Sequence, residues 1–61
     1  MFKKGEVLIL TMSENGDTGE YFNLRVVSCE DGLLKVKDPD GKLVVYNMHS
    51  RAFVKARRQD D

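Results

Sequence analysis

Two side chains in this chain of 61 residues could take part in nucleophilic catalysis, Cys29 and His49. A catalytic thiol needs an adjacent base and surroundings that stabilise its thiolate. The alternation around Cys29 predicts a strand, where a free cysteine usually packs as a small hydrophobe, and His49 falls in a polar segment that predicts a solvated turn. We therefore expect no catalytic residue and no enzyme activity. One cysteine with one histidine also falls short of a structural zinc site, so no metal and no cofactor are expected.

Basic residues are the second group whose types and spacing could bind a ligand. Strand-like alternation places Arg25 on one predicted strand and Lys35 and Lys37 on the next, and same-face side chains of neighbouring strands lie together. With Tyr21 and Tyr46 nearby in sequence, these cations could hold phosphates and stack a base. The alternative is that they keep an exposed face soluble and protect the sheet edges. The candidate binding residues are Arg25, Lys35, Lys37, Tyr46, Arg51, Lys55 and Arg57.

The charge balance bears on the choice of partner. Ten basic and ten acidic residues give a formal net charge of zero, whereas a non-specific nucleic-acid binder normally carries a basic excess. Three acids and no base fall between residues 14 and 20, and four bases and no acid fall between residues 51 and 58. The acidic segment would repel a nucleic acid that approaches from its side. A protein partner is therefore favoured over a nucleic acid.

The predicted apolar faces carry a surplus that a partner would cover. Val27 and Cys29 share the predicted face of Arg25, and Leu33 and Val44 fall opposite the register expected to form the core. An exposed patch of this kind on a short all-β chain favours docking on another protein or pairing with a second copy.

The elements that must position these residues are organised by residues 24–46, where apolar and polar side chains alternate on either side of two turn signals. The first signal ends at Gly32, and the second is Asp38-Pro39-Asp40-Gly41, which predicts a positive φ at Gly41 after a type I turn. Together they predict a three-stranded antiparallel meander. Residues 13–19 predict a loop too long for a tight hairpin turn. The expected strands are residues 7–11, 22–29, 33–37, 42–46 and 53–55.

The end of the chain leaves two alternatives open. Residues 51–58 suit either a strand or a helix, although Phe53 and Val54 favour a strand. Residues 47–50 break the alternation and suit a short turn, with one turn of 3₁₀ helix as an option.

The predicted core residues are Val7, Ile9, Leu24, Val26, Leu34, Val36, Val45 and Val54.

The size of the chain predicts one domain, residues 1–58, followed by a frayed tail at residues 59–61. No apolar run approaches the roughly 20 residues that a membrane helix needs, and the N-terminus lacks the apolar core of a signal peptide. A single free cysteine, Cys29, fits a reducing compartment. We therefore expect a cytoplasmic protein with no membrane partner and no small-molecule substrate.

The order of elements resembles an SH3-like small β-barrel, the architecture of SH3, Tudor and KOW-type modules. The resemblance covers residues 2–57 and rests on Lys4-Gly5-Glu6-Val7 at the first strand, on Asp31-Gly32 and on Asp40-Gly41. It implies a non-enzymatic binding module of about five antiparallel strands. Relative to the KOW pattern, Asp17-Thr18 replaces the basic residue expected before Gly19.

A second resemblance concerns Leu8-Ile9-Leu10-Thr11, which is similar to the opening strand of small dimeric β-proteins of the carbon storage regulator type. That resemblance implies RNA binding. Met12 and Ser13 stand where the family has basic residues, and Arg51 is the nearest counterpart of the arginine expected later in the chain. The sequence thus favours a protein-binding module, with an RNA- or DNA-binding protein as the alternative.

Overall fold

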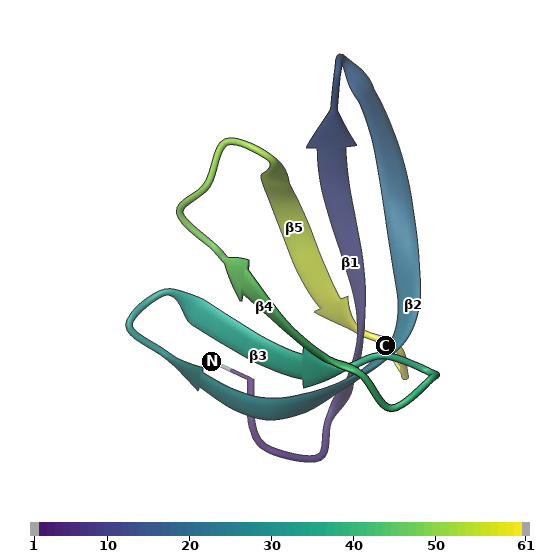
Figure 1. The fold of residues 1–61 in the computed structure, drawn as a ribbon, viewed down its shortest axis with the longest axis vertical. Helices are drawn as coiled ribbons and strands as arrows, with labels where there is room; N and C mark the ends of the chain where they lie inside the picture. Colours follow the sequence, from purple (N-terminus) through teal and green to yellow (C-terminus); the bar gives the residue numbers. More distant parts are fainter. Residues whose placement is uncertain (1, 61) are drawn as a thin grey trace.

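The computed structural model describes residues 2–60, which form five antiparallel strands and no helix. The strands lie in one sheet in the order β4-β3-β2-β1-β5, which leaves β4 and β5 as its two edges (Figure 1). The predicted all-β class is confirmed, but the sheet is not closed into a barrel within the described residues. The strand bounds are Val7–Glu14 (β1), Asp17–Glu30 (β2), Leu33–Lys37 (β3), Leu43–Asn47 (β4) and Phe53–Arg58 (β5).

The long strand β2 holds the two halves of the sheet together. Its first part pairs with β1 and its last part pairs with β3, and Arg25 has a partner on both sides. The register shifts opposite residues 8–10 of β1 and again between Val26 and Ser28, and β-bulges of this kind bend a strand and increase its twist. In Figure 1, β1 and the first part of β2 follow the long axis of the molecule, whereas β3 runs across it.

The core lies on one face of this bent sheet. Its six fully or nearly fully buried side chains come in pairs from β1, β2 and β3, because alternate residues of a strand point to the same face. Partly buried side chains from the N-terminal segment, from the end of β2, from β4 and the connection after it, and from β5 pack around them. The buried residues are Leu8, Leu10, Leu24, Val26, Leu34 and Val36, and the surrounding ones are Phe2, Cys29, Val44, Tyr46, Met48, Phe53 and Ala56.

Part of the predicted core is corrected by the structure. Leu24, Val26, Leu34 and Val36 are buried as predicted. Ile9 is also buried, at 5% exposure, although it lies outside the core cluster. Leu8 and Leu10 occupy the core positions of β1 in place of the half-buried Val7. The assignments of Val45 and Val54 were wrong, since these side chains are 51% and 49% exposed.

The long loop predicted over residues 13–19 is also wrong. β1 continues to Glu14 and β2 begins at Asp17, so that only Asn15 and Gly16 form the turn. Both have positive φ, 51° and 87°, as a two-residue type I′ hairpin requires. Asparagine followed by glycine is the residue pair that this turn favours, because both tolerate the left-handed region. The resulting β1–β2 hairpin projects past the rest of the sheet (Figure 1).

The turn between β3 and β4 has the predicted geometry. The Gly41 amide donates to the Asp38 carbonyl at 2.9 Å, and Gly41 has φ +83°. The Asp38 side chain adds two hydrogen bonds, since its Oδ1 accepts from the amides of Asp40 at 3.0 Å and Lys42 at 2.8 Å. The side chain of Asp38 therefore fixes the shape of the turn, as an aspartate at this position often does.

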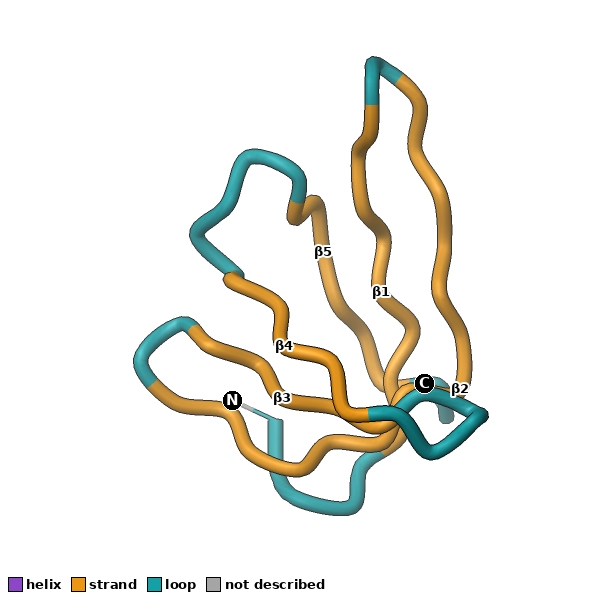
Figure 2. Tube along the Cα trace, in the orientation of Figure 1, coloured by secondary structure: helices purple, strands orange, loops and turns teal. Residues whose placement is uncertain are grey.

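The C-terminal segment is a strand, β5, which settles the choice between strand and helix left open for residues 51–58. β5 pairs with β1 along the edge opposite to β4, and two consecutive turns connect it to β4 (Figure 2). In these turns the Ser50 amide donates to the Asn47 carbonyl at 3.0 Å, and the Phe53 amide donates to the Ser50 carbonyl at 3.1 Å. A 3₁₀ helix at this point is not shown.

Candidate functional site

Cys29 and His49, the two candidate catalytic side chains, each lie against other parts of the fold. Cys29 is a free, half-buried cysteine that packs against the core. His49 is exposed in the β4–β5 connection, and its ring lies against Gly32 so closely that a Cβ at Gly32 would collide with it. Within residues 2–60, no three His, Cys, Asp or Glu side chains gather in a way that could hold a metal ion.

Three of the candidate binding residues lie together on the face of the sheet opposite the core, which we call the outer face. Arg25 of β2 and Lys37 of β3 are direct cross-strand partners. Lys35 lies two residues before Lys37 on the same face, opposite Ser28 of β2 and Val45 of β4. The expected proximity of Arg25 to the lysines of β3 is therefore confirmed for Lys37.

The remaining cations form a separate group. Lys55 and Arg57 belong to β5, where their partners are Thr11 and Ile9 of β1. They alternate with Ala56, which packs against the core, so they lie on the outer face as well, but β1 and β2 lie between them and Lys37. Arg51 is exposed in the connection between β4 and β5.

Tyr46 lies on the opposite face from Arg25, Lys35 and Lys37. It pairs with Leu34 across β3 and β4 and packs half-buried against the core. Burial raises the pKa of the Tyr46 hydroxyl above its ordinary value of 10.0, and nearby Tyr21 adds to the rise. The structure therefore does not bring Tyr46 together with the three cations, and its role in binding stays a prediction.

Exposed apolar side chains share the outer face with the lysines. Leu33 of β3 and Leu43 and Val45 of β4 are 42%, 54% and 51% exposed. The register pairs Lys35 with Val45 and Lys37 with Leu43, so that apolar and cationic side chains alternate across the two strands. We call this surface the β3–β4 face and define it by Leu33, Lys35, Lys37, Leu43 and Val45.

The β3–β4 face ends at an open strand edge. β4 pairs only with β3 in the described sheet, so its other edge has backbone groups that no strand satisfies. An edge strand of this kind can pair with a strand of another chain unless charge, proline or a bulge blocks it. The register of β3 with β4 runs without a shift from Leu33–Asn47 to Lys37–Leu43, so no bulge blocks this edge.

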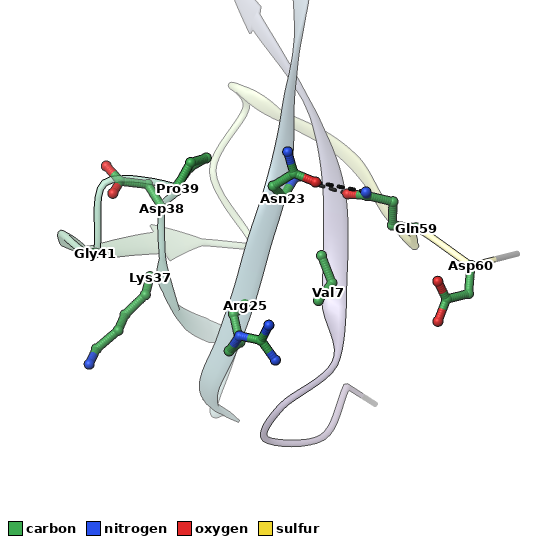
Figure 3. Close-up of a pocket in the computed structure, with 9 residues that line it drawn as sticks. All are labelled: Val7, Asn23, Arg25, Lys37, Asp38, Pro39, Gly41, Gln59 and Asp60. Atoms are coloured by element: carbon green, nitrogen blue, oxygen red, sulfur yellow. Dashed lines mark hydrogen bonds between the residues drawn. The ribbon is translucent and has the colours of Figure 1, made fainter.

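An open hollow of about 540 Å³ adjoins the β3–β4 face. As Figure 3 shows, strand residues, among them Arg25, lie between the turn after β3 on one side and the C-terminal Gln59 and Asp60 on the other. Its lining is mixed in charge, with two cations, two carboxylates and two amides. The lining residues are Val7, Asn23, Arg25, Lys37, Asp38, Pro39, Gly41, Gln59 and Asp60.

Asn23 and Gln59 are the residues of this hollow that the sequence did not single out. Asn23 lies at the bulge of β2 with φ +58°, a conformation that asparagine tolerates better than most residues. Its side chain and backbone amide both bond to Gln59, whose own backbone amide donates to the Val7 carbonyl at 2.8 Å. An asparagine within a strand was the available signal. The last residue of the predicted tail, Asp61, lies outside the described residues.

Comparison of the chain with protein-family models, with curated proteins and with solved structures found no match. The described residues include no helix long and apolar enough to cross a membrane. The class that the fold defines is therefore a small all-β protein with one five-stranded antiparallel sheet.

Proposed function

We propose that this protein is an SH3-like, non-enzymatic binding module of the cytoplasm that docks on another protein through the β3–β4 face. The observation that carries the proposal is the half-exposure of Leu33, Leu43 and Val45 beside an unpaired strand edge. The SH3-like assignment is supported by the five antiparallel strands and by the return of β5 to pair with β1. The compartment is inferred from the free thiol of Cys29.

The chemistry of the β3–β4 face defines the partner. A strand added to the edge of β4 would satisfy the free backbone groups of that edge and would place alternate side chains on the outer face. Apolar side chains at these positions would cover Leu43 and Val45, and acidic ones would approach Lys35 and Lys37. The partner that fits is therefore an extended protein segment in which apolar and acidic residues occur together.

The test compares two valines of equal exposure on the two edges of the sheet. Val45 on β4 is 51% exposed and Val54 on β5 is 49% exposed, so each substitution by glutamate changes surface charge and apolar area alike. We expect the tagged protein and its Val54→Glu variant to retain the same proteins from a nuclease-treated lysate, and Val45→Glu to lose them. Equal loss from both variants would exclude the β3–β4 face as the docking surface. Loss of all retained material after nuclease treatment would favour nucleic acid.

Binding of RNA or DNA is the second candidate. It is favoured by the cluster of Arg25, Lys35 and Lys37, which lies on the same face as Lys55 and Arg57. Phosphate contacts release counterions, so affinity for a mixed oligomer would fall steeply with salt, and the double substitution Lys35→Glu and Lys37→Glu would weaken it. Fluorescence anisotropy measures this directly. Absence of binding at low salt, where charges are least screened, would eliminate this candidate, and that is the outcome we expect.

A further inference from the structure

The strand β2 has a free edge along its first half. Residues 25–30 of β2 pair with β3, whereas residues 17–22 have β1 as their only neighbouring strand in the described sheet. In Figure 1 this half of β2 forms one side of the projecting hairpin, and no strand lies beside its far edge. The backbone groups that point away from β1 along this half can therefore pair with a strand of another chain. We call residues 17–22 the β2 free edge.

The side chains of the β2 free edge are apolar and acidic. Tyr21 and Phe22 are 41% and 50% exposed, and Asp17 and Glu20 are exposed as well. Tyr21 pairs with the core residue Leu10, so by alternation Glu20 and Phe22 lie on the outer face. The Glu20 carboxylate makes no hydrogen bond or ion pair within residues 2–60. This edge is therefore an extended segment of the chemistry that the β3–β4 face would bind.

Charge favours contact between unlike edges of two copies. Two β2 free edges would bring acids against acids, and two β4 edges would bring the lysines of β3 toward each other, and like charges that face each other destabilise a strand pair. A β2 free edge beside β4 instead brings Glu20 toward Lys35, which lies opposite Val45 one strand behind the edge. Strands lie about 4.8 Å apart, so the two charged side chains have about 10 Å to span, which their length allows. The zero net charge of the chain removes overall repulsion between copies.

The order of the strands lets the two outer faces meet on one side. β2 and β4 run in the same direction, since each is antiparallel to β3. The free edge of β2 lies on the side where β3 pairs further along the strand, and the free edge of β4 lies on the side away from β3. Half a turn of one copy within the plane of the sheet therefore brings these edges together antiparallel. Phe22 of one copy then lies on the same side of the sheet as Leu43 and Val45 of the other.

We propose that a second copy of this chain docks on the β3–β4 face through its β2 free edge, with Glu20 beside Lys35. This inference rests on the proposed function and names an occupant of its docking surface. The added strand forms backbone hydrogen bonds with β4. Phe22 of the added strand covers the exposed Leu43 and Val45.

Sedimentation velocity of the purified protein, over a concentration series at low salt, measures the association. We expect the wild type to associate as its concentration rises. Glu20→Lys and Lys35→Glu should each weaken the association by about tenfold, because each places two like charges at the contact. The double variant with both changes restores an opposite pair and should associate like the wild type. A double variant as weak as the single ones, or a wild type that stays monomeric throughout, would overturn the proposal.

Two matched controls reverse charges away from the proposed contact. Glu30→Lys changes an exposed acid of β2 in the half that pairs with β3, and Lys55→Glu changes an exposed cation of the outer face on β5. Both variants should associate like the wild type. Loss of association with Lys55→Glu but not with Lys35→Glu would place the second copy on the β5 edge and overturn the proposal. All these residues are exposed, so urea unfolding should show free energies within about 0.5 kcal/mol of the wild type.

Amide hydrogen exchange locates the contact between copies. Exchange should slow in residues 17–22 and 43–47 as the concentration rises, because amides on these free edges gain hydrogen-bond partners. Amides of residues 33–37 already lie between two strands, so their exchange should stay the same. If the copies associated while exchange in both edge segments stayed unchanged, the contact would not run through the strand edges, and the proposal would be wrong.

The docking function and this inference can fail separately. Glu20→Lys leaves β4 intact, so at the dilution of a lysate it should retain the same proteins as the wild type. Val45→Glu should lose both those proteins and the self-association. If the purified wild type stayed monomeric while Val45→Glu still lost the lysate proteins, this inference would fail and the docking function would stand. Self-association that survived Val45→Glu would show that the second copy docks elsewhere.

Discussion

Gln59 and Asn23, 36 positions apart in the chain, are joined by two hydrogen bonds. Oε1 of Gln59 accepts from the Asn23 backbone amide at 2.9 Å, and Nε2 of Gln59 donates to Oδ1 of Asn23 at 2.7 Å. Asn23 lies at the bulge of β2 with φ +58°, and a bulge leaves one residue without its partner in the ladder. The Gln59 side chain thus supplies a hydrogen-bond partner for the Asn23 backbone amide at the bulge.

We expect Gln59→Ala to lower the free energy of unfolding by about 1 kcal/mol, because both hydrogen bonds between the Gln59 side chain and Asn23 are lost. At Asn23, alanine should destabilise more than glycine, since positive φ costs a residue with a Cβ about 1 kcal/mol or more. Urea unfolding followed by circular dichroism measures both. If Asn23→Ala and Asn23→Gly were equally stable, backbone strain at the bulge would play no part.

Gly41 tests the turn after β3. Its φ is +83°, and a Cβ built there meets no atom within 4 Å, so any loss on substitution comes from backbone strain. Gly41→Val should therefore destabilise by roughly 1–2 kcal/mol. Gly19 is the control, because a Cβ there also meets open space while its φ is not positive. Chemical denaturation should show Gly41→Val as clearly less stable than Gly19→Val.

Two valines test which face of the sheet forms the core. Val36 is fully buried and Val45 is 51% exposed, although they lie on neighbouring strands. Val36→Ala removes two buried carbon atoms and should cost about 1.5–2 kcal/mol, whereas a surface substitution such as Val45→Ala usually stays within about 0.5 kcal/mol. Urea midpoints compare the two. A larger loss of stability for Val45→Ala than for Val36→Ala would mean that Val45 faces the core and that β4 pairs with β3 in a register shifted by one residue.

Glu6 makes stability depend on pH in the acid range. Its pKa is lowered from the ordinary 4.5, first by the hydrogen bond from the Lys3 backbone amide at 2.5 Å and then by the side chain of Arg58. A lowered pKa stabilises the folded protein above the ordinary value, and this stabilisation is lost as pH falls through the folded pKa.

The difference in unfolding free energy between wild type and Glu6→Gln should therefore narrow on acidification from above pH 4.5. The difference in unfolding free energy between wild type and Arg58→Gln should change less with pH, because the hydrogen bond from the Lys3 amide still lowers the pKa of Glu6 in that variant. Urea unfolding over a pH series measures both variants. A difference that stays constant with pH would contradict the role of Glu6.

The sequence was most informative where alternation met turn residues. β3 has the predicted bounds, and Gly41 has the predicted positive φ. The prediction failed at residues 13–19, although Asn15-Gly16 is a strong signal for a type I′ turn. In that segment β1 and β2 continue beyond the core, so neither face is buried and their side chains are mostly polar. The segment therefore lacks the alternation of apolar and polar residues that indicates a strand.

The faces of the strands were harder to predict than their positions. Residues 7–10 and 43–45 are apolar at every position, so alternation cannot tell which side faces the core. At Cys29 the cause differs, because the bulge between Val26 and Ser28 reverses the alternation and turns Cys29 toward the core. A shift of one residue exchanges the two faces for the rest of that strand.

For the candidate site, the sequence alone predicted that Arg25 could lie near the lysines of the next strand, because the turn at Asp31-Gly32 joins those two strands. The direct pairing of Arg25 with Lys37 also needs the bulge between Val26 and Ser28, since the turn alone would pair Val26 with Lys37. The sequence could not place Tyr46 on the core side, nor bring Gln59 beside Asn23, since both depend on how the bent sheet folds back on itself. Local turn chemistry sets which strands pair, and it acts over a few residues. The hollow required the bulge in β2 and the return of β5 along β1, which are settled only when the whole sheet packs around one core.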